Sequence, residues 1–414
     1  MNSGAASCDV KAESRSALRY RDFNLHMCGR LLGNAGALVL SVGIGWQVYD
    51  LTHDPFALGM VGLCQFLPCL LLVLHAGHLA DRLDRARLLA ATYLLSALCG
   101  AAMLFLTLEG NREVWPIYLL SVVLGVVRIT GSPTSKALVP ALVPAGSFSS
   151  AISYSAMAFQ IATIGGPALG GIAYMFGAAA VYQLATLCLL LATLLNIMIR
   201  TRNSGGKRPA DRENMLAGLK FIMARPIMLG AISLDLFAVL FGGVVALLPV
   251  YARDILHVGP QGLGFLRGAP ALGAAFMALA LARIPIRRGV GVKLFISVAI
   301  FGVATIGFGL SENFYLSFGL LAILGAADMI SVYVRTHLTQ LQTPDSMRGR
   351  VASVSMLFVT ASNELGEFES GVTASWFGTV PATIMGGVLT MAVVALCAWR
   401  IPALRRIDRF EESA

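Results

Sequence analysis

The stretch Gly77-His78-Leu79-Ala80-Asp81-Arg82-Leu83-Asp84-Arg85-Ala86-Arg87 decides the fold of this chain. It is short and heavily charged, and it separates two long apolar runs, Phe56–Ala76 and Leu88–Leu108. A helix needs about 20 apolar residues to cross the hydrocarbon core of a bilayer, and both runs reach that length. The stretch therefore predicts a tight turn between two membrane helices, on the side where Lys and Arg are retained.

The composition also indicates an integral membrane protein. Of the 414 residues, 57% are hydrophobic and 13% are charged, and the mean hydropathy is +0.75. A soluble domain carries about twice that charged fraction. Because most basic residues fall in loops, the net charge of +9 does not call for a nucleic-acid partner. The lipid bilayer is the expected surrounding.

Neither the cysteines nor the histidines form a site. The seven cysteines show no ligand spacing, and most lie in apolar runs, so they are expected to act as small hydrophobic residues. The six histidines are scattered, and no Gly-x-x-x-x-Gly-Lys-Ser/Thr loop is present to bind nucleotide phosphates. We expect no enzyme activity, no cofactor, no metal and no ATP-binding site.

Apolar runs and loop signals divide the chain into two halves. They predict twelve spans, near 24–50, 56–80, 87–109, 115–140, 151–176, 178–200, 226–250, 260–283, 292–311, 314–340, 351–378 and 381–402. The expected units are a tail at 1–23, a six-helix bundle at 24–200, a linker at 201–225, a second bundle at 226–402 and a tail at 403–414. Part of the linker, Met215–Met223, is suited to a short amphipathic surface helix. No cleaved signal peptide is expected, because the first 23 residues are polar and charged.

The distribution of Lys and Arg predicts the orientation. Most of the 31 basic residues fall in segments on the same side as the two tails. Only Arg112 and Arg253 fall in loops on the other side. The positive-inside rule therefore predicts that both termini lie in the cytoplasm, in a bacterial cytoplasmic (inner) membrane.

The two halves show an internal repeat. At an offset of 200 residues, Pro144, Ser153, Gly166 and Gly171 match Pro344, Ser353, Gly366 and Gly371. At an offset of 205, Asp54-Pro55 and Leu58-Gly59 match Gly259-Pro260 and Leu263-Gly264. Parallel repeats of this kind are typical of transporters built from two bundles related by an axis along the membrane normal.

The spacing of Gly77, Asp81, Arg82 and Arg85 resembles the loop between helices 2 and 3 of the major facilitator superfamily. The resemblance implies a cytoplasmic gate in which Asp81 approaches the N-terminus of span 11, near 350–351. A helix N-terminus favours a carboxylate, because its backbone N–H groups are free. An ordinary basic loop is the alternative, although it would need neither Gly77 nor Asp81.

Three further stretches resemble the enterobactin-exporter-like branch of that superfamily. They are Gly43-Ile44-Gly45-Trp46-Gln47-Val48-Tyr49-Asp50-Leu51-Thr52, Leu247-Leu248-Pro249-Val250-Tyr251-Ala252-Arg253-Asp254 and Thr343-Pro344-Asp345-Ser346-Met347-Arg348-Gly349-Arg350-Val351. The resemblance covers most of the chain. It implies an all-α membrane protein with twelve transmembrane helices in two pseudo-symmetric six-helix bundles. The branch includes both siderophore exporters and drug-efflux proteins.

Ionisable residues inside the predicted spans are candidates for function, because they are costly in lipid. They are Arg30, Arg128, Asp235, Arg267, Asp328, Arg335, Glu364, Glu367 and Glu369. Glu364 and Glu367 share a helical face, and two such carboxylates cannot both stay ionised cheaply. We therefore expect proton coupling, at Glu367 first, with Glu364, Asp235 and Asp328 as further candidates. The alternative is a structural ion pair of these glutamates with Arg267 or Arg335.

Span 5 contains a run of small residues around one proline. Gly166, Pro167, Gly170 and Gly171 would allow close helix packing, and the proline removes one backbone hydrogen bond. In the major facilitator superfamily this pattern in helix 5 marks export, so the resemblance implies export here. Plain tight packing is the alternative.

The inward faces of spans 1, 2, 4, 5, 7, 8, 10 and 11 would line a central cavity. Candidate cavity residues are Arg128, Arg267, Arg335, Phe237, Phe241 and Asn363. Arginines favour a cargo with acidic oxygens, so we expect a monomeric exporter of a siderophore-like small molecule that exchanges protons. Broad drug efflux is the nearer alternative, and a membrane sensor without transport activity is the more distant one.

Overall fold

The computed structural model describes residues 16–82, 84–201, 212–344 and 347–410, without the side chains of residues 69, 72–82 and 212–216. This part of the chain is helical and contains no strand. Ten of its helical segments are long and apolar enough to cross a membrane, and α2 adds a shorter apolar helix at Pro55–Pro68. The glutamates on α13 make that long helix more polar than the ten.

Twelve long helical segments are described, at nearly the predicted limits. The first half contains α1 Arg21–Thr52, α2 Pro55–Arg82, α3 Arg85–Leu108, α4 Trp115–Leu142, α5 Phe148–Ala173 and α6 Ala178–Ile197. The second half contains α8 Pro226–Phe241 with its continuation to residue 255, α10 Gly259–Arg283, α11 Val290–Gly309, α12 Phe314–Gln342, α13 Arg348–Phe377 and α14 Thr379–Arg400. The short elements are η1 Ala17–Arg19, η2 Ala145–Ser147, η3 Tyr174–Phe176, α7 Arg212–Met223 and α15 Pro402–Arg406.

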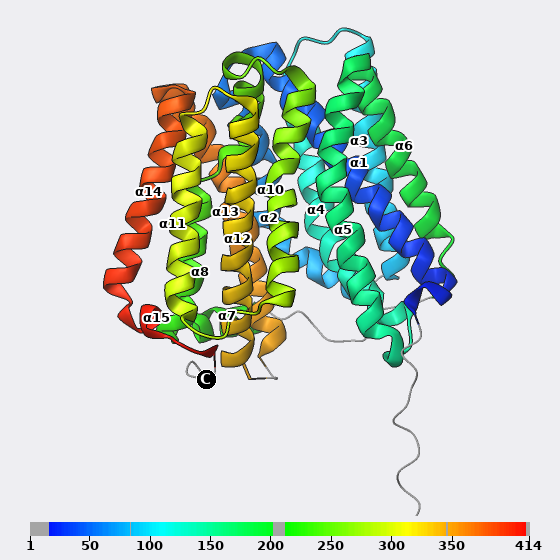
Figure 1. Cartoon of the computed structure of the whole chain (residues 1–414). Coiled ribbons are helices and arrows are strands. Elements are labelled where there is room, and N and C mark those ends of the chain that lie inside the picture. The colour runs from blue at the N-terminus through cyan, green and yellow to red at the C-terminus, as the bar shows by residue number, and fades with distance from the viewer. Residues whose placement is uncertain (1–15, 83, 202–211, 345–346, 411–414) are drawn as a thin grey trace, which may run out of the picture.

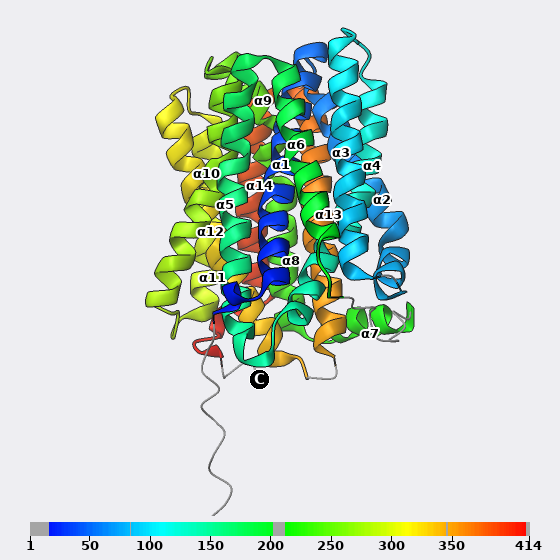
Figure 2. The same ribbon diagram turned by 90° about the vertical axis from the view of Figure 1, so that its right-hand side faces the viewer.

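These helices form two bundles side by side (Figure 1). In the first bundle α1 packs on α5 and α6, and α3 packs on α4 and α6; in the second, α12 packs on α10 and α11, and α11 packs on α14. The start of α1 and the end of α15 lie at the lower end in Figure 1, here called the terminal end. Helix α7 lies across that end, nearly perpendicular to the long helices (Figure 2).

The bundles meet where α5 crosses α10 and where α2 crosses α13. Gly171 faces Gly264 at the first crossing, and a Cβ on Gly171 would lie 3.0 Å from the Gly264 Cα. Gly371 faces Gly59 at the second, where the corresponding distance is 2.6 Å. Because Gly171 matches Gly371 and Gly59 matches Gly264 in the internal repeat, the two crossings are equivalent. The sequence repeat therefore corresponds to a repeat of backbone contacts.

The charged stretch between spans 2 and 3 is more helical than predicted. Helix α2 continues to Arg82 and α3 begins at Arg85, so the connection is only residues 83–84. Asp84 caps α3 by accepting a hydrogen bond from the backbone N–H of Arg87, at 3.0 Å. The observed limits, 82 and 85, lie within two residues of the predicted limits, 80 and 87, so the turn is present but shorter than predicted.

Span 7 is broken rather than continuous. Helix α8 ends at Phe241, and after Gly242 and Gly243 the chain continues as η4 Val244–Leu247, α9 Leu248–Val250 and η5 Tyr251–Ile255, the last a π-helix. The carbonyl of Gly243 accepts a hydrogen bond from Ser370 Oγ on α13, at 2.9 Å. A side chain from the neighbouring helix thus bonds a carbonyl at the break.

Candidate functional site

An ion pair joins the two bundles in the interior. Arg128 of α4 donates through Nη1 to Oε1 of Glu364 on α13. The Glu364 side chain is 2% exposed, whereas that of Arg128 is 57% exposed. Within the described residues, Oε2 of Glu364 has no hydrogen-bond partner. The site therefore contains a buried carboxylate with one oxygen paired and the other available.

A second arginine crosses in the opposite direction. Arg267 of α10 donates to the carbonyl oxygen of Ser41 on α1 at 3.0 Å, and to its hydroxyl at 2.9 Å. A Cβ on Gly45 would lie 3.4 Å from Nη1 of Arg267, so a small residue leaves room for the guanidinium. Each bundle thus extends one arginine into the other.

Glu367 lies one helical turn from Glu364, on the side of α13 that faces α2. A Cβ on Gly62 of α2 would lie 2.9 Å from the Glu367 Cβ. Glu369 points elsewhere and accepts a hydrogen bond from Thr373 on its own helix, at 2.8 Å. The contacts fit the expectation that Glu364 and Glu367 share a face, but the partner of Glu364 is Arg128, neither of the two arginines predicted for it.

Arg335 belongs to a different cluster, inside the second bundle. It pairs with Asp235 of α8 at 2.6 Å, and Ser331 Oγ donates to Asp235 at 3.2 Å. The two charged side chains are 11% and 5% exposed. Asp328 lines a small cavity with Asp235, Ser331 and α11 residues. The structure therefore separates Asp235, Asp328 and Arg335 from the site between the bundles, although the sequence grouped all of them.

The remaining cavity candidates lie on α8 and α13. Phe237 and Phe241 stack, with ring centroids 6.2 Å apart and an interplanar angle of 17°. Phe237 is 42% exposed. Asn363 is exposed, and its Nδ2 donates to the carbonyl of Val359 in the preceding turn, at 2.9 Å. These groups provide an aromatic surface and an accessible amide.

The run of small residues on α5 packs against both bundles. A Cβ on Gly166 would lie 3.0 Å from the Leu38 Cβ of α1, and Gly170 lies against Val42 of the same helix. On the other side, Gly171 and the carbonyl of Pro167 contact α10. A larger residue at Gly166 or Gly170 would therefore push α5 away from α1, and one at Gly171 would push it away from α10.

The proposed gate residues are only partly described. The side chains of Asp81 and Arg82, and the surroundings of Gly77, lie outside what the structure describes. Arg85 donates through Nη1 to the carbonyl of Ala137 on α4, at 2.9 Å. The described hydrogen bond of Arg85 therefore lies within the first bundle and does not cross to the second.

Sequence reasoning missed a network at the end opposite the termini. Arg253 pairs with Asp50 across the bundles, and the Tyr49 hydroxyl donates to Asp254. Tyr49 and Asp254 are 205 residues apart, so they are equivalent positions of the repeat. The signal was present, because both partners of each contact lie in stretches that resemble the exporter branch.

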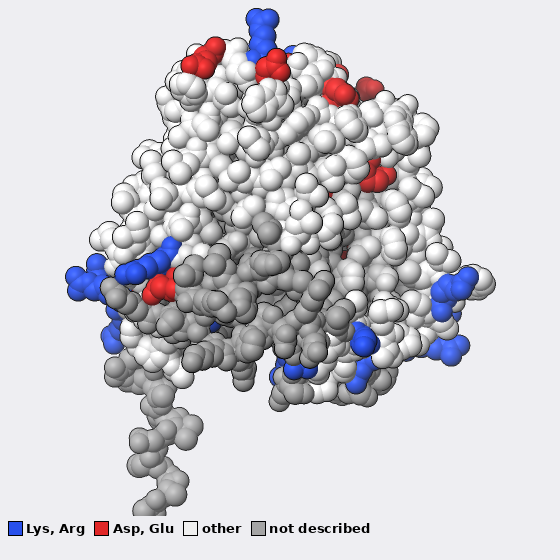
Figure 3. Space-filling model, turned by 180° about the vertical axis from the view of Figure 1, so that it is seen from behind, with Lys and Arg blue, Asp and Glu red and all other residues white. Residues whose placement is uncertain are grey.

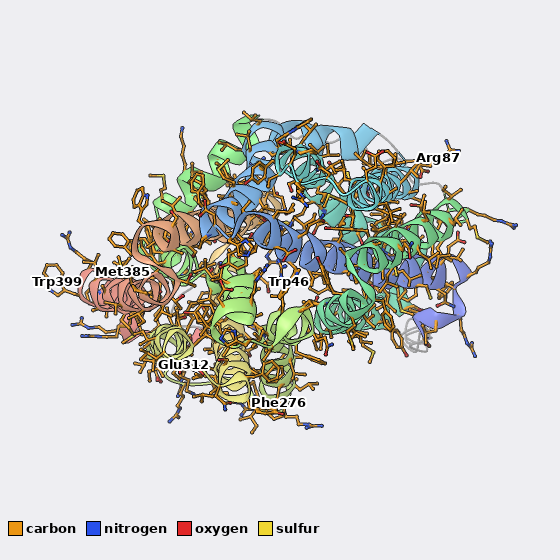
Figure 4. All side chains as sticks on the ribbon, turned by 90° about the horizontal axis from the view of Figure 1, so that it is seen from above. Trp46, Arg87, Phe276, Glu312, Met385 and Trp399 are labelled. Atoms are coloured by element: carbon orange, nitrogen blue, oxygen red, sulfur yellow. The ribbon has the colours of Figure 1, made fainter. Side chains whose placement is uncertain are left out.

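Views of the whole molecule fit a membrane location. On the face in Figure 3 basic residues gather toward the terminal end, and a largely uncharged region lies above them. Seen from the opposite end, Trp46 lies centrally between the bundles, whereas Phe276 and Trp399 lie at the periphery (Figure 4). Their side chains are 75% and 72% exposed. Large apolar side chains on the outside are typical of a surface that contacts lipid.

Known proteins with similar sequences are transporters. The chain is 25% identical over 371 residues to the staphyloferrin A transporter of Staphylococcus aureus, covering 86% of this chain and 91% of that protein. It is 25% identical over 367 residues to the enterobactin exporter EntS of Shigella dysenteriae, covering 85% and 82%.

Solved structures share the fold. One is a bacterial homologue of the lysosomal transporter Spinster in an inward-facing, unoccupied conformation, with a TM-score of 0.69, 15% identity, and coverage of 95% of this chain and 96% of that one. Another is a bacterial homologue of the iron transporter ferroportin in the inward-facing state, with a TM-score of 0.68, 18% identity, and coverage of 95% and 100%.

A family model described as transmembrane secretion effector matches residues 13–413, nearly the whole chain. The match agrees with the helical bundles and the apolar spans, and it makes the protein a multi-pass membrane transporter rather than an enzyme. The chain belongs to the transmembrane secretion effector family of the major facilitator superfamily.

Proposed function

We propose that this protein is a proton-coupled secondary exporter, which moves a siderophore-like small molecule out of the cytoplasm across the inner membrane. The observation that carries the proposal is the pair of Arg128 and Glu364, in which each bundle supplies one charge. The names of the relatives, a staphyloferrin A transporter and an enterobactin exporter, support this class of cargo.

Alternating access is supported by where the bundles touch. Helices α5 and α10 are in contact at Gly171 and Pro260. They are still in contact further along, where Gln160 donates a hydrogen bond to the Ala271 carbonyl at 2.7 Å. Helix α5 starts at the terminal end (Figure 1), and the α5 positions of these contacts range from its middle to its last turn. With both termini in the cytoplasm, as the basic residues favour, this is an inward-facing state. In the outward-facing state Asp81 would meet the start of α13 and close the cytoplasmic side.

Glu364 has the properties required for exchange of cargo against a proton. When ionised, its free Oε2 can accept a hydrogen bond from a hydroxyl or amide of the cargo, while Arg128 donates to an acidic oxygen. Protonation of Glu364 removes its charge and weakens the bond to the cargo. Cargo and proton therefore compete for one carboxylate, which is the requirement for antiport. Burial makes Glu364 a stronger candidate than Glu367, the first choice from sequence.

Uptake of the siderophore cargo into liposomes that contain the purified full-length protein tests the coupling. We expect Glu364→Gln to abolish uphill transport driven by a pH gradient, because the amide cannot exchange a proton. Downhill exchange should be retained with a weaker apparent affinity for the cargo, because the amide is as neutral as the protonated carboxyl group. Glu369→Gln, on the same helix but bonded to Thr373, is the matched control and should transport uphill. Uphill transport by Glu364→Gln at the wild-type rate would refute the assignment.

Deletion of the gene under iron starvation tests the cargo. We expect less siderophore in the medium and no change in resistance to lipophilic cations. Normal secretion together with new sensitivity to such cations would favour broad drug efflux, for which the stacked aromatic pair of exposed Phe237 and half-buried Phe241 is suited.

A further inference from the structure

A groove lies at the terminal end of the first bundle, outside the site between the bundles. Its volume is about 360 Å³, and it is lined by Arg19, Arg21, Asn24, Leu25, Cys28 and Leu195. These residues come from η1, the first turns of α1 and the end of α6. In Figure 1 the start of α1 leaves the bundle beside the end of α6, at its outer edge.

The groove is basic, and among the described residues its charges are weakly compensated. Arg19 and Arg21 are exposed, and Arg21 lies 4.0 Å from the Asp22 carboxylate. Asp22 already accepts hydrogen bonds from Thr201 Oγ1 at 2.6 Å, and from the backbone N–H groups of Thr201 at 2.8 Å and Arg200 at 3.1 Å. Its carboxylate thus holds the end of α6 to α1, and the two guanidinium groups remain available to an anion.

An apolar stripe leads to this groove along α6. Leu187, Leu191, Leu194 and Met198 follow one another at helical spacing and are 56%, 41%, 56% and 51% exposed. Leu25 and Leu195 continue the apolar surface into the groove. A ligand that matches both parts has an anionic group at the membrane surface and a hydrocarbon chain beside it.

We propose that this groove binds the headgroup of an anionic phospholipid, with its acyl chains along α6. Arg19 and Arg21 would donate to the phosphate oxygens. Basic pockets near the membrane surface are known to favour such headgroups.

Lipid binding to the purified, delipidated full-length protein tests the proposal. The probes are phosphatidylglycerol, phosphatidylcholine with the same acyl chains, and inorganic phosphate, with apparent affinity measured by native mass spectrometry. We expect phosphatidylglycerol to bind best and Arg19→Gln with Arg21→Gln to weaken it about 30-fold, equivalent to about 2 kcal/mol at about 1 kcal/mol per basic residue. Arg405→Gln with Arg406→Gln, exposed at the same end of the other bundle, is the matched control and should bind as the wild type does.

A second variant keeps the test independent of the arginine side chains. Leu195→Glu adds a negative charge to the groove and removes part of its apolar surface, so it should weaken phosphatidylglycerol binding more than phosphatidylcholine binding. Unchanged binding in both variants would overturn the site. Equal binding of inorganic phosphate and phosphatidylglycerol would overturn the lipid assignment in favour of a free anion.

Discussion

Replacing Gly371 with alanine should force the bundles apart at the end opposite the termini. The added Cβ would lie 2.6 Å from the Cα of Gly59, 2.7 Å from its backbone nitrogen and 2.8 Å from the carbonyl oxygen of Pro55. All three are backbone atoms, so no side chain can rotate away, and α2 and α13 must separate. Overpacking of this kind costs about 1–3 kcal/mol.

That cost falls only on the state in which the crossing is closed. The ratio of open to closed molecules should therefore rise by about 5- to 150-fold. Alanine also favours the helix over glycine by up to about 1 kcal/mol, but it does so in both states, so the gain cancels. Gly319→Ala, on α12 of the same bundle, is the matched control, because nothing lies within 4 Å of its added Cβ.

Spin labels at residues 112 and 312 measure the effect. Arg112 follows α3 and Glu312 follows α11, so the labels report on opposite bundles. In a cysteine-free background we expect Gly371→Ala to populate a longer distance between the labels and Gly319→Ala to leave the distance distribution unchanged. Identical distributions in the two variants would show that the glycine crossing does not control closure.

Two further predictions concern the charged groups. Arg253→Gln should weaken closure at the same end by about 0.2–1 kcal/mol, because both partners of its ion pair are partly exposed. The charge reversal Asp50→Arg with Arg253→Asp should restore the wild-type distance distribution between the same spin labels. Failure of the reversal would assign the effect to another contact. Asp235→Asn should destabilise the second bundle by at most about 3–5 kcal/mol, because Arg335 is 11% exposed and loses the carboxylate with which it pairs, while its more distant interaction with Asp328 remains. Adding Arg335→Gln should recover most of the thermal stability in detergent, and equal melting temperatures of wild type and Asp235→Asn would argue against the buried pair.

The sequence predicted the bundles well, because apolar length and the positions of Lys and Arg are local properties. It also predicted close packing around Gly166 and Gly171, although not which helices meet there; the structure shows Gly171 at a crossing of the two bundles. It did not predict the partner of Glu364. Helical spacing shows which residues share a face of α13, but Arg128 reaches Glu364 through the packing of two separate bundles.

The separation of Asp235 and Arg335 from the central site was unpredictable for the same reason. A charged residue in a span can point toward the other bundle or into its own bundle, and the helical periodicity of the sequence does not distinguish these two directions. Helix α2 ends two residues beyond its predicted limit, because charged residues can continue a helix past an apolar run and hydropathy does not show where it stops.

The division of the central ion pair between the halves has a consequence for biosynthesis. Arg128 enters the membrane with the first bundle, whereas Glu364 is translated 236 residues later. Until α13 is inserted, the first bundle has a guanidinium without this counter-charge, and the newly made second bundle has a carboxylate in need of one. Docking of the two halves neutralises both charges, so two separately expressed half-molecules should be found together in the membrane.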